Sequence, residues 1–192
     1  MKGLSQIKIT SAVPNCITGL RIVGTAALLF IEPLSAAFYI VYTFSGFSDL
    51  LDGWIARATN TTSELGSRLD SIADLLLYAV MIIRVFPELW KRLAVWIWYV
   101  LALVLVLRLV SYGYVAIRYH RFSAMHTYGN KVTGLLAFLV PYFLLLKNAT
   151  PACGVVVIVA LLSTVEELVL HLCMEEYDPR VKSVFMLKGK AE

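Results

Sequence analysis

Four aspartates lie close together in an apolar part of the chain, at Asp49, Asp52, Asp70 and Asp74. The first two are three residues apart and the last two are four apart, so each pair shares one face of a helix. Carboxylates in such surroundings repel one another and take up protons unless cations neutralise them. Because the ligand set contains no His or Cys, the spacing predicts a site for two or more Mg2+ or Mn2+ ions.

Small residues and an arginine accompany the aspartates. Gly53 and Gly66 lack a side chain and therefore allow a ligand or another backbone to approach closely. Arg57 lies five residues after Asp52, where its guanidinium can pair with a phosphate. Divalent cations bridge phosphate oxygens and offset the charge that builds up in phosphoryl transfer. The stretch therefore predicts metal-assisted phosphoryl chemistry.

The composition predicts that this site belongs to an integral membrane protein. Of the 192 residues, 59% are hydrophobic and 16% are charged, and the mean hydropathy is +0.77. A soluble domain rarely has such a composition. We expect the net charge of +4 to reflect contact with anionic lipid and orientation in the membrane, and not binding of nucleic acid. The three scattered cysteines suggest neither a disulfide framework nor a zinc site, and the N-terminus does not resemble a cleavable signal peptide.

Apolar runs separated by polar turns predict six membrane-spanning helices, at about residues 15–31, 34–58, 65–86, 93–117, 131–146 and 152–173. Pro87 is expected to end the third helix and Pro141 to kink the fifth. Residues 1–12 are expected to lie on the membrane surface, and residues 174–192 to form a cytoplasmic tail. The predicted fold is all-α, a single domain over residues 1–192 built as an integral membrane bundle of six transmembrane helices with a short N-terminal interfacial segment.

Basic residues predict the orientation of this bundle. Six spans place both termini on one side, together with the aspartates, and most lysines and arginines between or beyond the spans lie on that side. The opposite side carries only Arg84, Lys91, Arg92 and Lys147. The positive-inside rule therefore predicts a multi-pass protein of the cell membrane whose termini and aspartate site face the cytoplasm.

The aspartate stretch resembles the signature of the CDP-alcohol phosphotransferase (CDP-alcohol phosphatidyltransferase) family. It reads Asp49-x-x-Asp52-Gly53-x-x-Ala56-Arg57, then eight residues, then Gly66-x-x-x-Asp70-x-x-x-Asp74, and all eight defining positions match. The entry into the first span, Pro14-Asn15-x-x-Thr18-x-x-Arg21, is similar to that of bacterial phosphatidylglycerolphosphate synthases.

The resemblance implies a reaction and assigns roles to residues. A CDP-linked lipid, usually CDP-diacylglycerol, is attacked by an alcohol, and CMP leaves. The four aspartates would hold two metal ions, and Asp74 would also take the proton from the acceptor hydroxyl. The cytidine diphosphate would be contacted by Gly53, Ala56, Arg57 and Gly66. Membrane lipids and a second copy of the chain, in a homodimer, are the partners that the resemblance implies.

The acceptor is less closely defined. Where family members use a phosphorylated alcohol, cationic residues hold its phosphate, and here these would be Arg108, Arg118 and Lys131. We expect glycerol 3-phosphate, with inositol phosphate, serine or phosphatidylglycerol as alternatives. Asn130 separates Gly129 from Lys131, where phosphatidylglycerolphosphate synthases usually have a Gly-Lys stretch, and this departure leaves the acceptor open.

Structural alternatives exist for several of these residues. Arg108 could instead pair with an acid elsewhere, and Glu166 and Glu167 of the last span are candidates for packing against it. Arg57 and Arg118 could be topology signals. Arg21 could extend to the membrane surface or bind a lipid phosphate, and we assign it no catalytic role. A different class of function is a cation or proton transporter that uses intramembrane acids. The absence of visible internal repeats favours the transferase.

Overall fold

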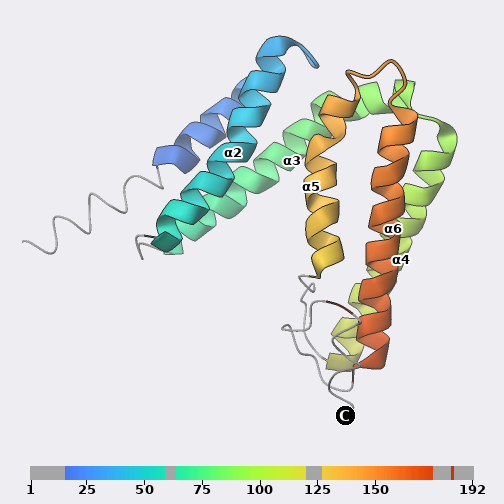
Figure 1. The fold of residues 1–192 in the computed structure, drawn as a ribbon. Coiled ribbons are helices and arrows are strands. Elements are labelled where there is room, and N and C mark those ends of the chain that lie inside the picture. The colour runs from blue at the N-terminus through green and yellow to red at the C-terminus, as the bar shows by residue number, and fades with distance from the viewer. Residues whose placement is uncertain (1–15, 59–63, 120–126, 175–182, 184–192) are drawn as a thin grey trace, which may run out of the picture. The chain divides into compact units, whose positions relative to one another are not determined.

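The computed structural model describes residues 16–58, 64–119, 127–174 and 183, and every regular element in these ranges is a helix (Figure 1). The expected interfacial segment at residues 1–12 lies outside the described residues, as does nearly all of the tail. A first helix spans Cys16–Ala27. It is followed by α2 (Ala36–Ala58), α3 (Glu64–Arg92), α4 (Val95–Tyr119), α5 (Tyr128–Phe143) and α6 (Thr150–Cys173). The prediction of an all-helical fold is confirmed.

Two of the six described helices, α4 and α6, are long and apolar enough to cross a membrane by their length and composition. The prediction that all six helices cross the membrane remains a prediction.

Pro87 does not end the third helix, so this prediction was wrong. Helix α3 continues through Pro87 to Arg92. A proline within a helix removes one backbone hydrogen bond and crowds the preceding turn, whereas ending the helix in an apolar segment would leave several backbone groups unpaired. Beyond the proline, the last turns are supported by an ion pair between Lys91 Nζ and Glu88 Oε1 at 3.1 Å.

The break between the first helix and α2 lies at Glu32-Pro33, as the sequence predicts. Leu34 has a φ of 62°, the left-handed backbone conformation that turns the chain back. Ser35 then caps α2, because its Oγ accepts a hydrogen bond of 3.2 Å from the backbone N–H of Phe38. Pro141 lies in the last turn of α5, and the kink expected there stays a prediction.

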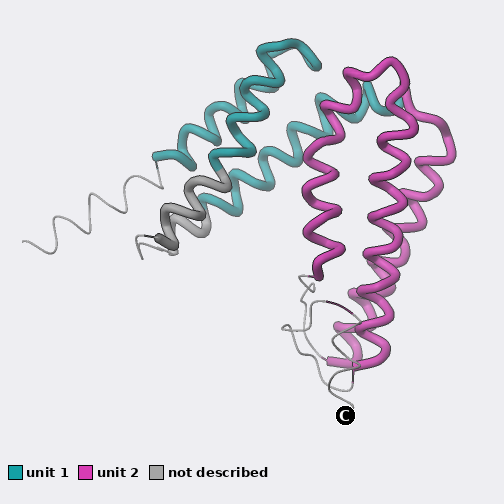
Figure 2. Tube along the Cα trace, viewed as in Figure 1, with its two compact units in different colours: residues 1–91 teal, residues 92–192 magenta. Residues whose placement is uncertain are grey.

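The described chain divides into two compact units, residues 1–91 and residues 92–192 (Figure 2). In the first unit, the first helix, α2 and α3 enclose a small core that includes Leu28, Phe38 and Ala73. Arg84 of α3 donates a hydrogen bond of 2.5 Å to the backbone oxygen of Ile31. This bond ties the turn that follows the first helix to α3.

In the second unit, α6 packs against both α4 and α5. Hydrogen bonds join the chain at both ends of this bundle. At one end, Arg92 Nη1 donates to the backbone oxygen of Leu144 at 3.2 Å. At the other, the Tyr119 hydroxyl donates to the backbone oxygen of Met174 at 2.6 Å. These bonds fix the helices in register, and the polar cluster described below depends on that register.

Helices α5 and α6 approach closely at Gly129. A Cβ added at Gly129 would lie 2.7 Å from Ser163 Oγ and 3.0 Å from Ser163 Cβ, whereas one added at Gly134 of the same helix meets nothing within 4 Å. Contacts this short force the helices apart or distort side chains.

We predict that Gly129→Ala lowers the free energy of unfolding by about 1–3 kcal/mol, the usual cost of overpacking. Gly134→Ala, its control, should be neutral or gain up to about 1 kcal/mol, because alanine favours the helix more than glycine does. Thermal unfolding of the purified protein in detergent measures both. Equal effects of the two substitutions would contradict the close approach.

Candidate active site

The backbone of the aspartate stretch is helical, as the spacing predicts. Asp49 and Asp52 lie near the end of α2, and Asp70 and Asp74 lie near the start of α3. The two helices follow each other in the chain (Figure 1). The side chains of residues 49–68 lie outside the description. This range includes Asp49, Asp52, Gly53, Ala56, Arg57 and Gly66, so the contacts predicted for them remain predictions.

Arg21 of the first helix lies against the second pair of aspartates. Its side chain is fully buried. Nη2 donates to Asp70 Oδ1 at 2.5 Å and to the Asp70 backbone oxygen at 3.2 Å, and lies 3.6 Å from Asp74 Oδ1. One guanidinium thus contacts both carboxylates, which lie one helical turn apart. This contact orients the carboxylates and offsets part of their mutual repulsion.

From the sequence, Arg21 was expected to reach the membrane surface or a lipid phosphate, whereas its side chain is buried and pairs with Asp70. A signal was available, because a guanidinium in an apolar helix requires an anionic partner. The nearest acids in the following helices are the aspartates. What the sequence did not show is which of the four would be the partner, since that depends on how the first helix packs against α3.

Asp70 and Asp74 fit a divalent cation in chemistry and in exposure. Their side chains are 44% and 46% exposed, so a ligand can reach them. Carboxylate oxygens are the ligands that Mg2+ and Mn2+ prefer, and the described contacts with Arg21 involve Oδ1 of each residue. Among the described side chains, no group of three or more His, Cys, Asp and Glu could hold a metal ion. The larger set predicted here includes Asp49 and Asp52.

A second cluster of polar side chains lies in the other unit, where α4, α5 and α6 meet. Arg108 Nη2 donates to Asn130 Oδ1 at 2.9 Å, and Arg108 Nη1 lies 3.5 Å from Glu167 Oε2. Asn130 Nδ2 donates to the same Glu167 oxygen at 3.0 Å. Ser163 Oγ donates to Asn130 Oδ1 at 2.8 Å. Each of the three helices thus contributes to one hydrogen-bonded network.

The structural alternative for Arg108 is therefore confirmed, since it pairs with an acid of the last helix. Glu167 is almost fully buried at 1% exposure, whereas the Arg108 side chain is 26% exposed. Glu166 points elsewhere and accepts a hydrogen bond of 2.8 Å from Ser183 Oγ. Arg108 keeps an accessible face while its charge is offset by a buried carboxylate.

The three cations predicted to hold the acceptor phosphate are not equally placed. Lys131 is exposed and follows Asn130 directly in α5. Its backbone is therefore adjacent to a residue of the Arg108 cluster. Arg118 lies ten residues after Arg108 in α4, a rise of about 15 Å along the helix. Its guanidinium lies over the rings of Tyr114 and Tyr119, 5.9 and 5.8 Å from their centroids. Lys131 is thus linked to the Arg108 cluster only as the residue after Asn130, whereas Arg118 has aromatic neighbours.

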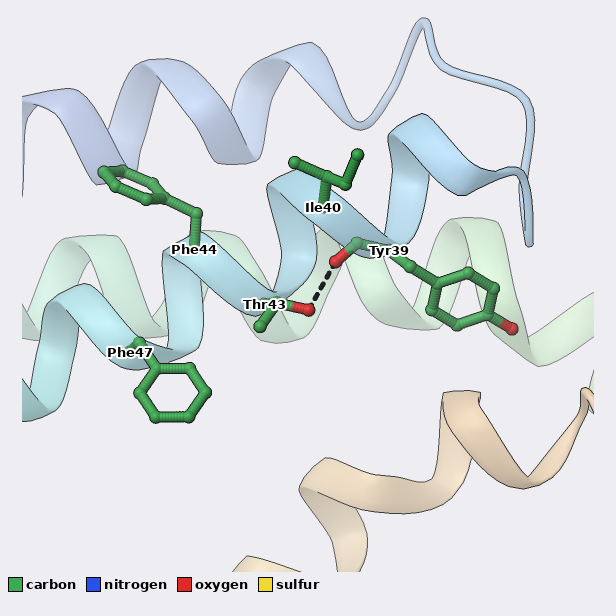
Figure 3. Close-up of a pocket in the computed structure, with 5 residues that line it drawn as sticks. All are labelled: Tyr39, Ile40, Thr43, Phe44 and Phe47. Atoms are coloured by element: carbon green, nitrogen blue, oxygen red, sulfur yellow. Dashed lines mark hydrogen bonds between the residues drawn. The ribbon is translucent and has the colours of Figure 1, made fainter.

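Helix α2 carries a shallow apolar recess on the turns that precede Asp49. It is lined by Tyr39, Ile40, Thr43, Phe44 and Phe47 (Figure 3). The Thr43 hydroxyl donates to the backbone oxygen of Tyr39 at 2.5 Å, so its polar group turns toward the helix itself. The face that remains is aromatic and aliphatic and leads along α2 toward the aspartates.

We predict that Glu167→Gln lowers the free energy of unfolding by about 1.5–3 kcal/mol, the range for a hydrogen bond to a charged group. The substitution keeps the shape of the side chain but removes the anion that faces Arg108. Glu166→Gln, at the neighbouring and less buried position, is the matched control and should change stability by less than about 0.5 kcal/mol. If thermal unfolding gave equal losses for both, the ion pair with Arg108 would not stabilise the bundle.

A family model and two curated relatives point to the same protein family. The family model described as CDP-alcohol phosphatidyltransferase matches residues 11–166. A CDP-diacylglycerol–glycerol-3-phosphate 3-phosphatidyltransferase of Pseudomonas fluorescens is 34% identical over 89 residues, which is 42% of this chain and 46% of that protein. The protein of the same name from Wigglesworthia glossinidia brevipalpis is 34% identical over 86 residues, 41% of this chain and 47% of its own. The chain thus spans about half the length of the curated relatives it matches. No solved structure matches it.

Proposed function

Because the chain belongs to the CDP-alcohol phosphatidyltransferase family, we propose that it transfers the phosphatidyl group of CDP-diacylglycerol to an alcohol and releases CMP. The observation that carries the proposal is the pair of half-exposed carboxylates, Asp70 and Asp74, held by the buried Arg21. Acids arranged in this way suit cations that bind a diphosphate. The names of both relatives support glycerol 3-phosphate as the acceptor.

Asp49, Asp52, Asp70 and Asp74 would hold two divalent cations, Mg2+ or Mn2+. When bound, the cations would neutralise charge on the diphosphate and on the departing CMP. Asp74 would accept the proton of the acceptor hydroxyl. The acceptor oxygen then forms a bond to the phosphorus of the phosphatidyl group, the bond from that phosphorus to the CMP oxygen breaks, and CMP leaves with the electron pair. Around the cytidine diphosphate we place Gly53, Ala56, Arg57 and Gly66.

The acceptor phosphate would lie near Arg108 and Lys131. Glu167 already offsets the charge of Arg108, so this arginine would contribute directed hydrogen bonds more than net charge. Lys131 is exposed and would supply the cation that attracts the phosphate. Arg118 would take part only if the acceptor extends along α4, since its described contacts are aromatic. Inositol phosphate, serine and phosphatidylglycerol remain the alternative acceptors.

We place the protein in the cell membrane as a multi-pass protein. Two apolar helices support membrane location, as do large apolar side chains on the outside of both units, such as Leu75 (70% exposed), Tyr99 (73%) and Ile117 (79%). The distribution of basic residues favours termini and an active site that face the cytoplasm. The recess on α2 suits an acyl chain of the lipid substrate. We include a homodimer in the proposal only because of the resemblance to the family.

We predict that the purified protein releases CMP from CDP-diacylglycerol when Mg2+ or Mn2+ and glycerol 3-phosphate are present. Asp74→Asn should lower kcat at least about a hundredfold, the lower range for loss of a catalytic acid–base group. Asp70→Asn should also lower kcat, because it removes a carboxylate that would hold the cations. Glu88→Gln, which alters an acid of the same helix that pairs with Lys91, should leave kcat unchanged. If no acceptor elicited CMP and Asp74→Asn changed ion flux in vesicles instead, the protein would be a transporter.

We predict that Lys131→Ala raises the KM for glycerol 3-phosphate about tenfold and leaves the KM for CDP-diacylglycerol unchanged. The reason is that an exposed cation contributes to binding of the acceptor phosphate equally in the ground and transition states. Lys147→Ala, beyond the other end of α5, serves as the control. Initial rates at varied acceptor concentration measure the effect, and mass analysis of the lipid product identifies the acceptor. An unchanged KM would remove Lys131 from the acceptor site.

A further inference from the structure

Arg21 places a permanent positive charge against the carboxylates that the proposed function assigns to cations. An arginine in a protein stays protonated. Its side chain is fully buried, and Asp70 holds it through both a carboxylate and a backbone oxygen. Burial and two hydrogen bonds to Asp70 thus keep the guanidinium in place. A divalent cation that binds Asp70 and Asp74 must share them with this charge.

The charges of the site lead to a consequence for metal binding. Four carboxylates balance two divalent cations, so the addition of Arg21 gives the loaded site a net positive charge. Because the Arg21 side chain is fully buried, water screens its repulsion of a nearby cation only in part. A bound diphosphate brings negative charge and removes the excess. On this charge balance, the second cation would be retained well only when the nucleotide is bound.

We propose that Arg21 is a positioning residue that couples the filling of the cation site to the arrival of the substrate's diphosphate. The inference rests on the proposed function, because that function supplies the cations and the nucleotide. Its use to the enzyme is that metal ions and substrate assemble together while Asp70 and Asp74 stay oriented in their absence.

The competing explanation is that Arg21 only ties the first helix to α3. Both explanations predict a less stable protein when Arg21 is replaced. They differ in what happens to metal affinity. If Arg21 only held the helices, its loss would loosen the carboxylates and weaken metal binding or leave it unchanged. If Arg21 repels the cations, its loss strengthens metal binding in the absence of nucleotide.

The experiment measures Mn2+ binding by electron paramagnetic resonance of the free ion, on the full chain purified in detergent, with and without CDP. For the wild-type protein we expect CDP to raise the Mn2+ affinity at least tenfold. For Arg21→Gln we expect the affinity without CDP to rise at least tenfold and the effect of CDP to fall at least threefold. Arg21→Lys keeps the charge and should preserve the coupling of the wild-type protein.

A folded Arg21→Gln protein with unchanged or weaker Mn2+ affinity in the absence of CDP would overturn the proposal. If that variant does not fold, as thermal unfolding would reveal, Arg21→Lys decides. A folded Arg21→Lys protein that loses the coupling overturns the proposal, and one that keeps it supports the proposal. A wild-type protein that releases CMP from CDP-diacylglycerol but shows no effect of CDP on Mn2+ affinity would overturn this inference alone. A wild-type protein that releases no CMP would overturn the proposed function.

Discussion

The ion pair between Arg21 and the aspartates of α3 is the interaction on which the first unit depends. A guanidinium that is fully buried must have an anionic partner, because its transfer from water into an apolar surrounding is otherwise very unfavourable. Asp70 Oδ1, at 2.5 Å, provides that partner, and Asp74 lies one turn further along α3. This contact ties the first helix to the turn of α3 that presents the two carboxylates together. Fold and site are determined by the same contact in this unit.

The second unit contains an ion pair with the opposite exposure. In the first unit the cation is buried and the carboxylates are almost half exposed. In the second unit Glu167 is buried and Arg108 retains an accessible face. The exposed partner of each pair determines which ligand it suits: half-exposed carboxylates suit a cation, and a partly exposed guanidinium suits a phosphate. The first unit thus offers carboxylates that suit metal ions, and the second unit offers a guanidinium that suits an anion.

Local patterns in the sequence predicted what depends on local physics. Apolar runs predicted the helices, and Glu32-Pro33 predicted the break before α2, since these signals act within a few residues. Pro87 was interpreted wrongly because the cost of one lost hydrogen bond is smaller than the cost of ending a helix among apolar residues. Arg108 was weighed as a possible partner for Glu166 or Glu167, but which of them it contacts depends on the rotation of α6. The role of Arg21 was not predicted, because its partner lies 49 residues away and no local signal specifies which of four aspartates it meets.

The structure gives a physical reason for Asn130, the residue at which the chain departs from the family pattern. From the sequence, its insertion between Gly129 and Lys131 counted against glycerol 3-phosphate as the acceptor. In the structure, its carboxamide oxygen accepts hydrogen bonds from both Arg108 and Ser163, and its nitrogen donates to Glu167. A side chain that is donor and acceptor at once is needed there, because the arginine can only donate and the carboxylate can only accept. Asn130 therefore completes the cluster that orients Arg108, while Lys131 remains exposed beside it. The presence of Asn130 changes how the Arg108 side chain is held. It is therefore no argument against a phosphorylated acceptor.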